Sequence, residues 1–466
     1  MVYISPLSNR YASRESLEIF SQENKIRTFR RLWIALAKAQ KELGLPITSE
    51  EITEMERSID IIDFAQIEGF EKRFRHDVMA NIHAFGALCP KAKSILHLGA
   101  TSCYVTDNTD LILMREALFL LLQKCAHLLR GFAKKGEKEA HSPCLAYTHF
   151  QPAQPTTIGK RICLWLQDFF FDLLEWKRLY EEIPFLGAKG ATGTQSSFLS
   201  LFGGDFHKVS QMELLIAKEF GFTKILTISG QTYTRKIDLT ILNALASFAA
   251  SAHKMATDLR LLAHEGEFVE SFQKEQVGSS AMPYKKNPIY SERICGIARF
   301  VISLAQNPAY TLATQWLERS LDDSSNRRIT LPEAFLGTDA ILNLLLHLTS
   351  ELHPVSDVAL KNVQEVLPML ATENLMMAAV KKGGDRQALH EKLRLLTQNR
   401  PIAKWMQEIE QDPDFQLTKK EVESLIALPS LVGCAPEQVK FFIQKELYPL
   451  LNKWNLPIPP LHPIEI

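Results

Sequence analysis

The stretch Gly278-Ser-Ser-Ala-Met-Pro-Tyr-Lys-Lys-Asn-Pro288 separates two long apolar patterns of helical spacing. Its glycine allows unusual backbone angles and its two prolines exclude a continuous helix, so the stretch is predicted to be a loop. Ser279 and Lys285 place a hydroxyl and an ammonium group in this loop. Such a loop can offer a proton acceptor, backbone N–H donors and a positive charge to a small anion. Taken alone, the same residues also suit a polar surface turn.

The overall composition indicates a folded protein without a global affinity for polyanions. The chain has 466 residues, of which 46% are hydrophobic and 23% are charged, and this length predicts two or three domains. Lys+Arg and Asp+Glu are equal at 53 each, so no net charge recruits nucleic acid or an anionic membrane surface. Seven Cys without C-x-x-C spacing suit a reducing compartment. With no signal-peptide pattern and no apolar run of about 18 residues, a soluble, cytoplasmic protein is expected.

Long helices dominate the predicted architecture. Asp107-Asn108-Thr109-Asp110 supplies cap residues and first-turn acids for a helix that continues from Leu111 to about Lys138. Helices of about 25 to 30 residues form rods of roughly 40 Å. Several are apolar on more than one face, which predicts burial in a bundle or against another subunit. The comparable patterns cover residues 158–180, 237–264, 289–301 and onward, and 331–352.

The predicted fold class is all-α with three domains. Residues 1–106 form an N-terminal helical domain, residues 107–353 the central bundle of long helices, and residues 354–466 a C-terminal helical domain broken by Gly and Pro. Strand signals are weak, and residues 224–229 are the best candidate for a short extended piece.

Two histidines are candidates for acid–base chemistry. His149 lies in the polar segment Thr148-His149-Phe150-Gln151-Pro152, and its ordinary pKa near 6.5 lets it hold a transferable proton. His76 is followed by Asp77 at the start of a helical pattern. A structural role for His149, and a helix cap formed by His76 and Asp77, are the alternatives.

Possible anion-binding groups occur in two further segments. Thr101 and Ser102 follow a glycine just before a helix, where exposed N–H groups can hold a carboxylate or phosphate, although such turns are common. The segment 318–328 contains Arg319, Arg327 and Arg328 among acids and hydroxyls. Guanidinium groups suit carboxylates and phosphates, whereas a salt-bridged surface helix is the simpler interpretation.

Eight segments together resemble the adenylosuccinate lyase family of the fumarase/aspartase superfamily, specifically the branch that includes the animal enzymes. The segments follow one another in order, and the resemblance covers the chain up to about residue 396. They are 8–13, 75–80, 97–105, 148–154, 187–195, 230–236, 278–288 and 321–328. The resemblance implies the three-domain lyase fold of the superfamily, whose long helices form a homotetramer core with each active site shared between three chains.

The resemblance also implies the roles of individual residues. His149 corresponds to the general acid, Ser279 to the base, and His76 to a residue that orients the substrate beside His149. Lys285 and Asn287 correspond to residues that hold the succinyl carboxylates. Further substrate contacts implied by the family are Arg10, Tyr11, Asp77, Thr101, Ser102, Thr148, Gln231, Arg293, Arg319, Ser324 and Arg328.

The implied reaction is a β-elimination that releases fumarate. Adenylosuccinate would give AMP, and succinylaminoimidazole carboxamide ribotide would give its carboxamide in purine biosynthesis. No metal or organic cofactor is implied, and no H-E-x-x-H, P-loop or dinucleotide glycine pattern occurs. Two alternatives stay open: a sibling lyase that acts on argininosuccinate, aspartate or malate, and a structural homologue without catalysis.

Overall fold

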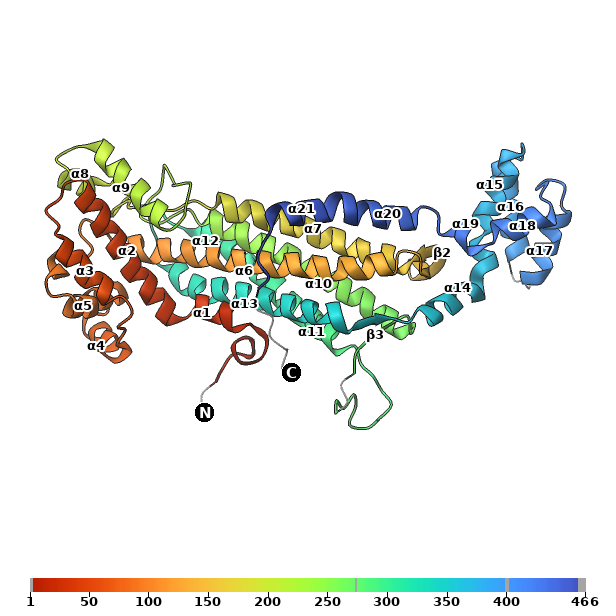
Figure 1. Cartoon of the computed structure of the whole chain (residues 1–466), viewed down its shortest axis with the longest axis horizontal. Coiled ribbons are helices and arrows are strands. Elements are labelled where there is room, and N and C mark those ends of the chain that lie inside the picture. Colours follow the sequence, from red (N-terminus) through yellow and green to blue (C-terminus); the bar gives the residue numbers. More distant parts are fainter. Residues whose placement is uncertain (1–2, 273–274, 399–401, 460–466) are drawn as a thin grey trace.

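The computed structural model describes residues 3–272, 275–398 and 402–459, and it is an elongated, almost entirely helical molecule (Figure 1). Five long helices run along its long axis, which confirms the predicted all-α class. α6 packs along α7 and α13, and α10 packs along α7 and α11. The bounds of the bundle helices are Ser102–Lys138 (α6), Ile158–Glu182 (α7), Lys236–His264 (α10), Ile289–Leu304 (α11) and Asp322–Glu351 (α13), with the shorter α12 at Gln306–Thr314.

The start of α6 differs from the sequence prediction. The helix begins at Ser102, so Asp107 and Asp110 lie inside it instead of capping it. Their carboxylates are bound by arginines of other elements, Asp107 by Arg235 and Asp110 by Arg327. Tertiary ion pairs therefore account for these acidic residues, which the local pattern alone assigned to a helix cap.

Short helices cover one end of the bundle (Figure 1). The structure confirms that His76 opens a helix, because it is the residue immediately before α5. The helices α8 and α9 lie at the same end. The elements at this end are α2 (Gln22–Glu42), α3 (Ser49–Arg57), α4 (Phe64–Phe74), α5 (Asp77–Leu88), η2 (Ala92–Ser94), α8 (Ser196–Leu201) and α9 (Phe206–Glu219). Before them in the sequence, η1 (Leu7–Tyr11) and α1 (Arg14–Ile19) pack on the bundle itself, η1 against α13 and α1 against α6 and α13.

The opposite end carries a β-hairpin and a small helical unit with its own apolar core, which includes Leu375, Trp405 and Phe415 (Figure 1). The last helices then return along α7, and Val439 and Ile443 join the main core. The elements are α14 (Ser356–Leu370), α15 (Thr372–Lys381), α16 (Arg386–Thr397), α17 (Ile402–Gln411), α18 (Lys419–Leu425), α19 (Leu428–Leu431), α20 (Ala435–Phe441), η3 (Phe442–Leu447) and α21 (Tyr448–Trp454).

Within the described residues, strands form two antiparallel pairs. β1 (Pro143–Thr148) pairs with β2 (Gln151–Thr157), and β3 (Phe268–Glu270) pairs with β4 (Leu352–Pro354). The extended piece predicted at residues 224–229 is not a strand, because it makes only one bridge, between Phe185 and Ile225. Two strands instead surround His149.

Only α13, among the described residues, is long and apolar enough to cross a membrane. Of its most apolar window, 72% is buried inside the protein. Such burial is typical of the core helix of a soluble protein.

Candidate active site

The first group of predicted site residues meets where α6 begins, and we call it the α6-start cluster: His76, Asp77, Thr101, Ser102, Gln231, Arg319, Ser324 and Arg328. His76 Nδ1 accepts a hydrogen bond of 3.4 Å from the backbone N–H of Met79, so His76 caps the N-terminus of α5. Its Nε2 lies 3.3 Å from Ser102 Oγ. Because Nδ1 is an acceptor, the proton of the neutral ring is on Nε2, which can donate a hydrogen bond to the Ser102 hydroxyl.

Asp77 links α5 to the start of α13. Its Oδ2 lies 2.7 Å from Arg328 Nη2, and the Arg328 side chain remains 57% exposed. The neighbouring Ser324 is half-buried in the first turn of α13. The cluster thus presents a carboxylate, a hydroxyl and a guanidinium from two elements far apart in the sequence.

Cys103 is a member of this cluster that the sequence prediction missed. Its Sγ lies 3.4 Å from Gln231 Oε1 and 2.8 Å from Arg319 Nη1. Burial raises the pKa of the thiol to about 12, so it stays protonated and can donate to the Gln231 carbonyl oxygen. Gln231 Nε2 in turn donates to the carbonyl oxygen of Ala191 at 3.0 Å. The only sequence signal was the position of Cys103 directly after Ser102.

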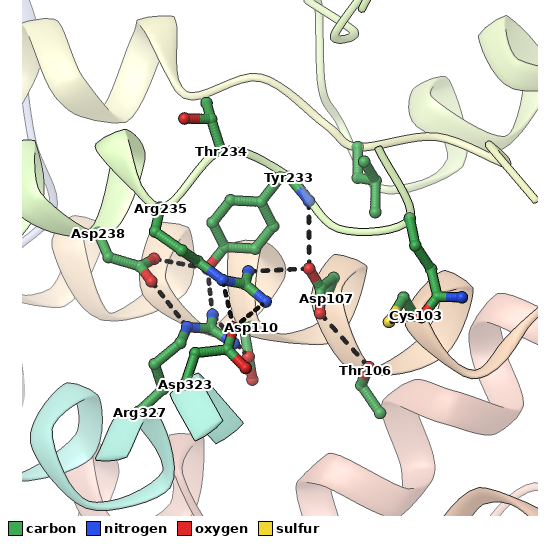
Figure 2. A network of polar contacts seen from close by, with 12 residues as sticks. Cys103, Thr106, Asp107, Asp110, Tyr233, Thr234, Arg235, Asp238, Asp323 and Arg327 are labelled. Atoms are coloured by element: carbon green, nitrogen blue, oxygen red, sulfur yellow. Dashed lines mark hydrogen bonds and ion pairs between the residues drawn. The ribbon is translucent and has the colours of Figure 1, made fainter. Parts of the chain in front are cut away.

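Behind the cluster lies a buried network of ion pairs (Figure 2). Arg235 donates to Asp107 Oδ2 at 2.9 Å and to Asp323 Oδ2 at 2.7 Å. Arg327 Nε donates to Asp238 Oδ2 at 2.7 Å, and Tyr233 OH donates to Asp238 Oδ1 at 2.5 Å. The network joins the 230–236 loop, which carries Gln231, to α6, α10 and α13.

The three arginines of the segment 318–328 therefore have different surroundings. Arg327 is buried in the network, whereas Arg328 and Arg319 belong to the α6-start cluster. Successive helical residues point about 100° apart, so Arg327 and Arg328 face different sides of α13.

Asp238→Ala is expected to lower the free energy of unfolding by about 3–5 kcal/mol, because it removes one partner of a buried ion pair and leaves Arg327 without its closest carboxylate. Asp60→Ala is the matched control. The carboxylate of Asp60 is 67% exposed and pairs with Arg27, so its loss costs about 1 kcal/mol or less. Chemical denaturation of both variants checks the difference, and equal midpoints would contradict it.

The second group is the tip of the β1–β2 hairpin. Thr148 pairs with Gln151, and the two residues between them, His149 and Phe150, both have positive φ, of 53° and 56°. A two-residue turn of this kind usually contains Asn or Gly, because other side chains are strained there. Thr148, His149 and Phe150 are all exposed. Strained turns occur often at functional sites, so the backbone strain at His149 and Phe150 marks this turn as a candidate site.

The third group is the loop 278–288, which we call the signature loop. Ser279 Oγ accepts hydrogen bonds from the backbone N–H groups of Met282 at 3.0 Å and Ala281 at 3.3 Å. Asn287 Nδ2 donates to the carbonyl oxygen of Gly278 at 2.9 Å and so ties the two ends of the loop together. Lys285 is exposed. Two N–H donors aimed at one hydroxyl oxygen favour its deprotonated form.

Gly278→Ala is expected to lower kcat/KM of a reaction that uses the signature loop by about tenfold or more, since displaced catalytic groups lose rates of that order. A Cβ at this position would lie 1.9 Å from the carbonyl oxygen of Lys285, so the loop must open. Gly296→Ala is the control, because a Cβ there meets nothing within 4 Å. Kinetics together with a thermal unfolding curve would separate loop distortion from global unfolding. Wild-type kinetics for Gly278→Ala would contradict the prediction.

Three further predicted residues lie outside these groups. Arg293 is half-buried on α11, and its Nη1 is buried without a hydrogen-bond partner among the described residues. A buried donor without a partner is unusual and calls for an explanation, of which a bound ion is one. Arg10 and Tyr11 lie in η1, and the carbonyl oxygen of Tyr11 accepts a 3.2 Å hydrogen bond from Asn343 of α13.

Within one chain, the α6-start cluster and the β1–β2 hairpin lie far apart. The 37 residues of α6 span about 55 Å, and β1 begins five residues after this helix ends. Figure 1 shows β2 at the opposite end of the molecule from α5, with β3 and the loop that follows it nearer to the β2 end. His76 and His149 of one chain therefore do not face one substrate. Within the described residues, no group of three or more His, Cys, Asp or Glu is arranged to hold a metal ion.

Comparisons with known proteins give a consistent result along the chain. Residues 3–303 match a family model described as lyase, and residues 368–442 match one described as adenylosuccinate lyase C-terminus. The chain is 45% identical to adenylosuccinate lyase of Saccharomyces cerevisiae, covering 96% of this chain and 95% of that protein. It is 44% identical to adenylosuccinate lyase of Schistosoma mansoni, covering 97% and 96%.

The resemblance thus extends past about residue 396, the limit expected from the sequence, because the C-terminal match continues to residue 442. The fold is also that of a fumarate lyase from Mesorhizobium sp. BNC1, with a TM-score of 0.82 at 20% identity over 95% of this chain and all of that one. With relatives from fungi and animals above 40% identity over nearly the whole length, the chain is a lyase that belongs to the adenylosuccinate lyase family.

Proposed function

We propose that the chain releases fumarate from adenylosuccinate to give AMP, and from succinylaminoimidazole carboxamide ribotide to give the corresponding carboxamide. The family supports this activity. The observation that carries the chemistry is the pair of backbone N–H groups on Ser279 Oγ. A serine is a weak base, and it removes a proton from carbon only where its alkoxide is stabilised.

In the proposed mechanism, Ser279 Oγ takes the proton from the succinyl carbon next to the carbon that bears nitrogen. The electron pair of the broken C–H bond forms the C=C bond of fumarate, and the C–N bond breaks. His149 gives a proton to the departing nitrogen. Lys285 holds a succinyl carboxylate whose negative charge increases as the proton leaves.

The α6-start cluster is proposed to bind the rest of the substrate. The Thr101 side chain does not cap α6, so the first N–H groups of this long helix remain for a carboxylate. His76 orients the succinyl group, and Thr101, Ser102 and Thr148 help to hold its carboxylates. The other groups of the cluster, with Arg293, Arg10 and Tyr11, contact the nucleotide part of the substrate. The unpaired Nη1 of Arg293 suits the phosphate.

A complete site requires more than one chain, because α6 separates His76 from His149 of the same chain. We infer a homotetramer in which three chains contribute to each site. Large apolar side chains exposed near the start of α13 support such contacts, since single chains rarely expose them as a group. They include Trp316 at 76%, Leu317 at 95% and Ile329 at 65% exposure.

The site residues require no cofactor in this mechanism, and nucleic acid and membranes are not proposed partners. All seven cysteines are free, and six of them are buried. Free thiols suit a reducing compartment, and we propose that the protein is cytoplasmic.

The test offers the purified protein five compounds in turn and measures the fumarate that forms. The compounds are adenylosuccinate, succinylaminoimidazole carboxamide ribotide, argininosuccinate, aspartate and malate. Release from the two purine ribotides alone is expected. Release from argininosuccinate, aspartate or malate would support a sibling lyase. Binding of the ribotides without release would support a homologue that has lost catalysis.

A further inference from the structure

Glu270 connects the two ends of the segment that carries the signature loop. It is the last residue of β3, and α11 begins at Ile289, directly after the loop. Its Oε2 accepts a hydrogen bond from the backbone N–H of Tyr290 at 2.9 Å. Its Oε1 accepts from the backbone N–H of Ser291 at 2.9 Å and from Ser291 Oγ at 2.6 Å. A single carboxylate therefore joins the entry of the loop to its exit.

These contacts replace a local helix cap. Pro288 precedes α11 and makes no side-chain cap hydrogen bond, so the first N–H groups of α11 need another acceptor. A carboxylate at a helix N-terminus also interacts favourably with the helix dipole. The acceptor comes from twenty residues before Tyr290 in the sequence, and it holds the first turn of α11 against β3.

The entry of the loop has its own anchors. Val269 pairs with His353, and Glu270 pairs with Leu352, between β3 and β4. The backbone N–H of Ser271 donates to the carbonyl oxygen of Glu351 at 2.7 Å. The entry of the loop is therefore fixed to the end of α13. Through the hydrogen bonds of Glu270, the exit of the loop is fixed to the same place.

We propose that Glu270 is a positioning residue for the elimination, because its carboxylate holds the entry of the loop, at the end of β3, next to the exit of the loop, at the start of α11. Ser279 and Lys285 lie in the loop between these two ends. Their position relative to the succinyl group therefore depends on where the two ends are held. The assignment rests on the proposed function, since it concerns the loop that carries the base.

Two substitutions of Glu270 and Ser291 test the proposal in the full-length protein. Glu270→Gln keeps the size of the side chain, but it loses the charge and places an amide N–H₂ group against N–H donors. Ser291→Ala removes only the hydroxyl and keeps both backbone hydrogen bonds. Glu275→Gln is the matched control, because it makes the same charge change at an exposed position within the same segment.

Two measurements are expected to change together in Glu270→Gln, kcat and the rate of trypsin cleavage, while the thermal unfolding midpoint stays nearly constant. Glu270→Gln should lower kcat for fumarate release by about 10- to 100-fold, the range for displaced catalytic groups, and Ser291→Ala should lower it less. Trypsin should cut Glu270→Gln faster than wild type after the exposed Lys285 and Lys286. The thermal unfolding midpoint should change little, and Glu275→Gln should match wild type in every measurement.

Three results would overturn the proposal. One is a Glu270→Gln variant with wild-type kcat and wild-type cleavage of the loop. The second is a loss of kcat accompanied by general unfolding, which would make Glu270 a stability residue only. The third is an equal loss in Glu275→Gln. If the wild-type protein releases no fumarate, the proposed function fails, and the trypsin comparison still decides whether Glu270 holds the loop.

Discussion

Ser279→Ala is expected to lower kcat for fumarate release by about 10²–10⁴-fold, the usual contribution of a general base. The methyl group cannot take the proton, and the N–H groups of Ala281 and Met282 lose the oxygen that they hold. KM should change much less, because Lys285 and the α6-start cluster still bind the substrate. Stopped-flow or steady-state assays of the purified variant give both constants.

The adjacent Ser280 provides the sharpest comparison for this prediction. It is exposed, and it differs from Ser279 in position but not in chemistry. Ser280→Ala should keep most of the activity. A folded Ser279→Ala protein with nearly wild-type turnover, or a larger loss in Ser280→Ala than in Ser279→Ala, would move the base to another residue.

His149→Gln is expected to cost a similar factor of about 10²–10⁴ in kcat, because glutamine can donate a hydrogen bond but cannot give its proton to the departing nitrogen. The hairpin should tolerate the change, since the imidazole is exposed at the turn. His141→Gln, at an exposed histidine just before β1, is the control and should retain activity.

Mixed oligomers extend this prediction to the shared site. His76→Gln and His149→Gln inactivate groups at opposite ends of one chain. If a site takes these groups from different chains, co-refolded mixtures should contain some sites with both histidines intact and should regain activity. Mixed oligomers that stay as inactive as the separate variants would mean that both histidines of a site come from one chain.

The sequence predicted the bundle well because helical periodicity is a local property. The rods at residues 158–180 and 237–264 correspond to α7 and α10 almost end to end. The start of α13 was placed nine residues late, at Leu331, because charged residues from Asp322 onward interrupt the apolar pattern. Those charges are satisfied by distant partners, such as Arg235 on Asp323, which no local window contains.

The β1–β2 hairpin could not be predicted from turn chemistry. His149 and Phe150 occupy left-handed positions that Asn and Gly normally fill, so the turn lacked its usual signal.

The residues of the candidate site were predicted from their motifs, whereas the distances between them within one chain could not be. Sequence order placed His76 and His149 within 73 residues of each other, yet α6 lies between them. Cys103 and Glu270 were missed because their partners lie far along the chain, 128 residues away for Gln231 and 21 residues away for Ser291. Contacts of this kind follow from the packing of helices, and residue type alone does not reveal them.

The length of α6 sets the distance between the α6-start cluster and the β1–β2 hairpin. Adding one residue to this helix would shift its far end by about 1.5 Å and rotate it by about 100°, so every group beyond it would face a new direction. In an assembly whose pockets join opposite ends of neighbouring copies, that error would appear in every pocket at once. Substitutions at exposed positions of α6 leave this spacing unchanged, whereas insertions and deletions in the helix require compensating changes in the helices packed alongside.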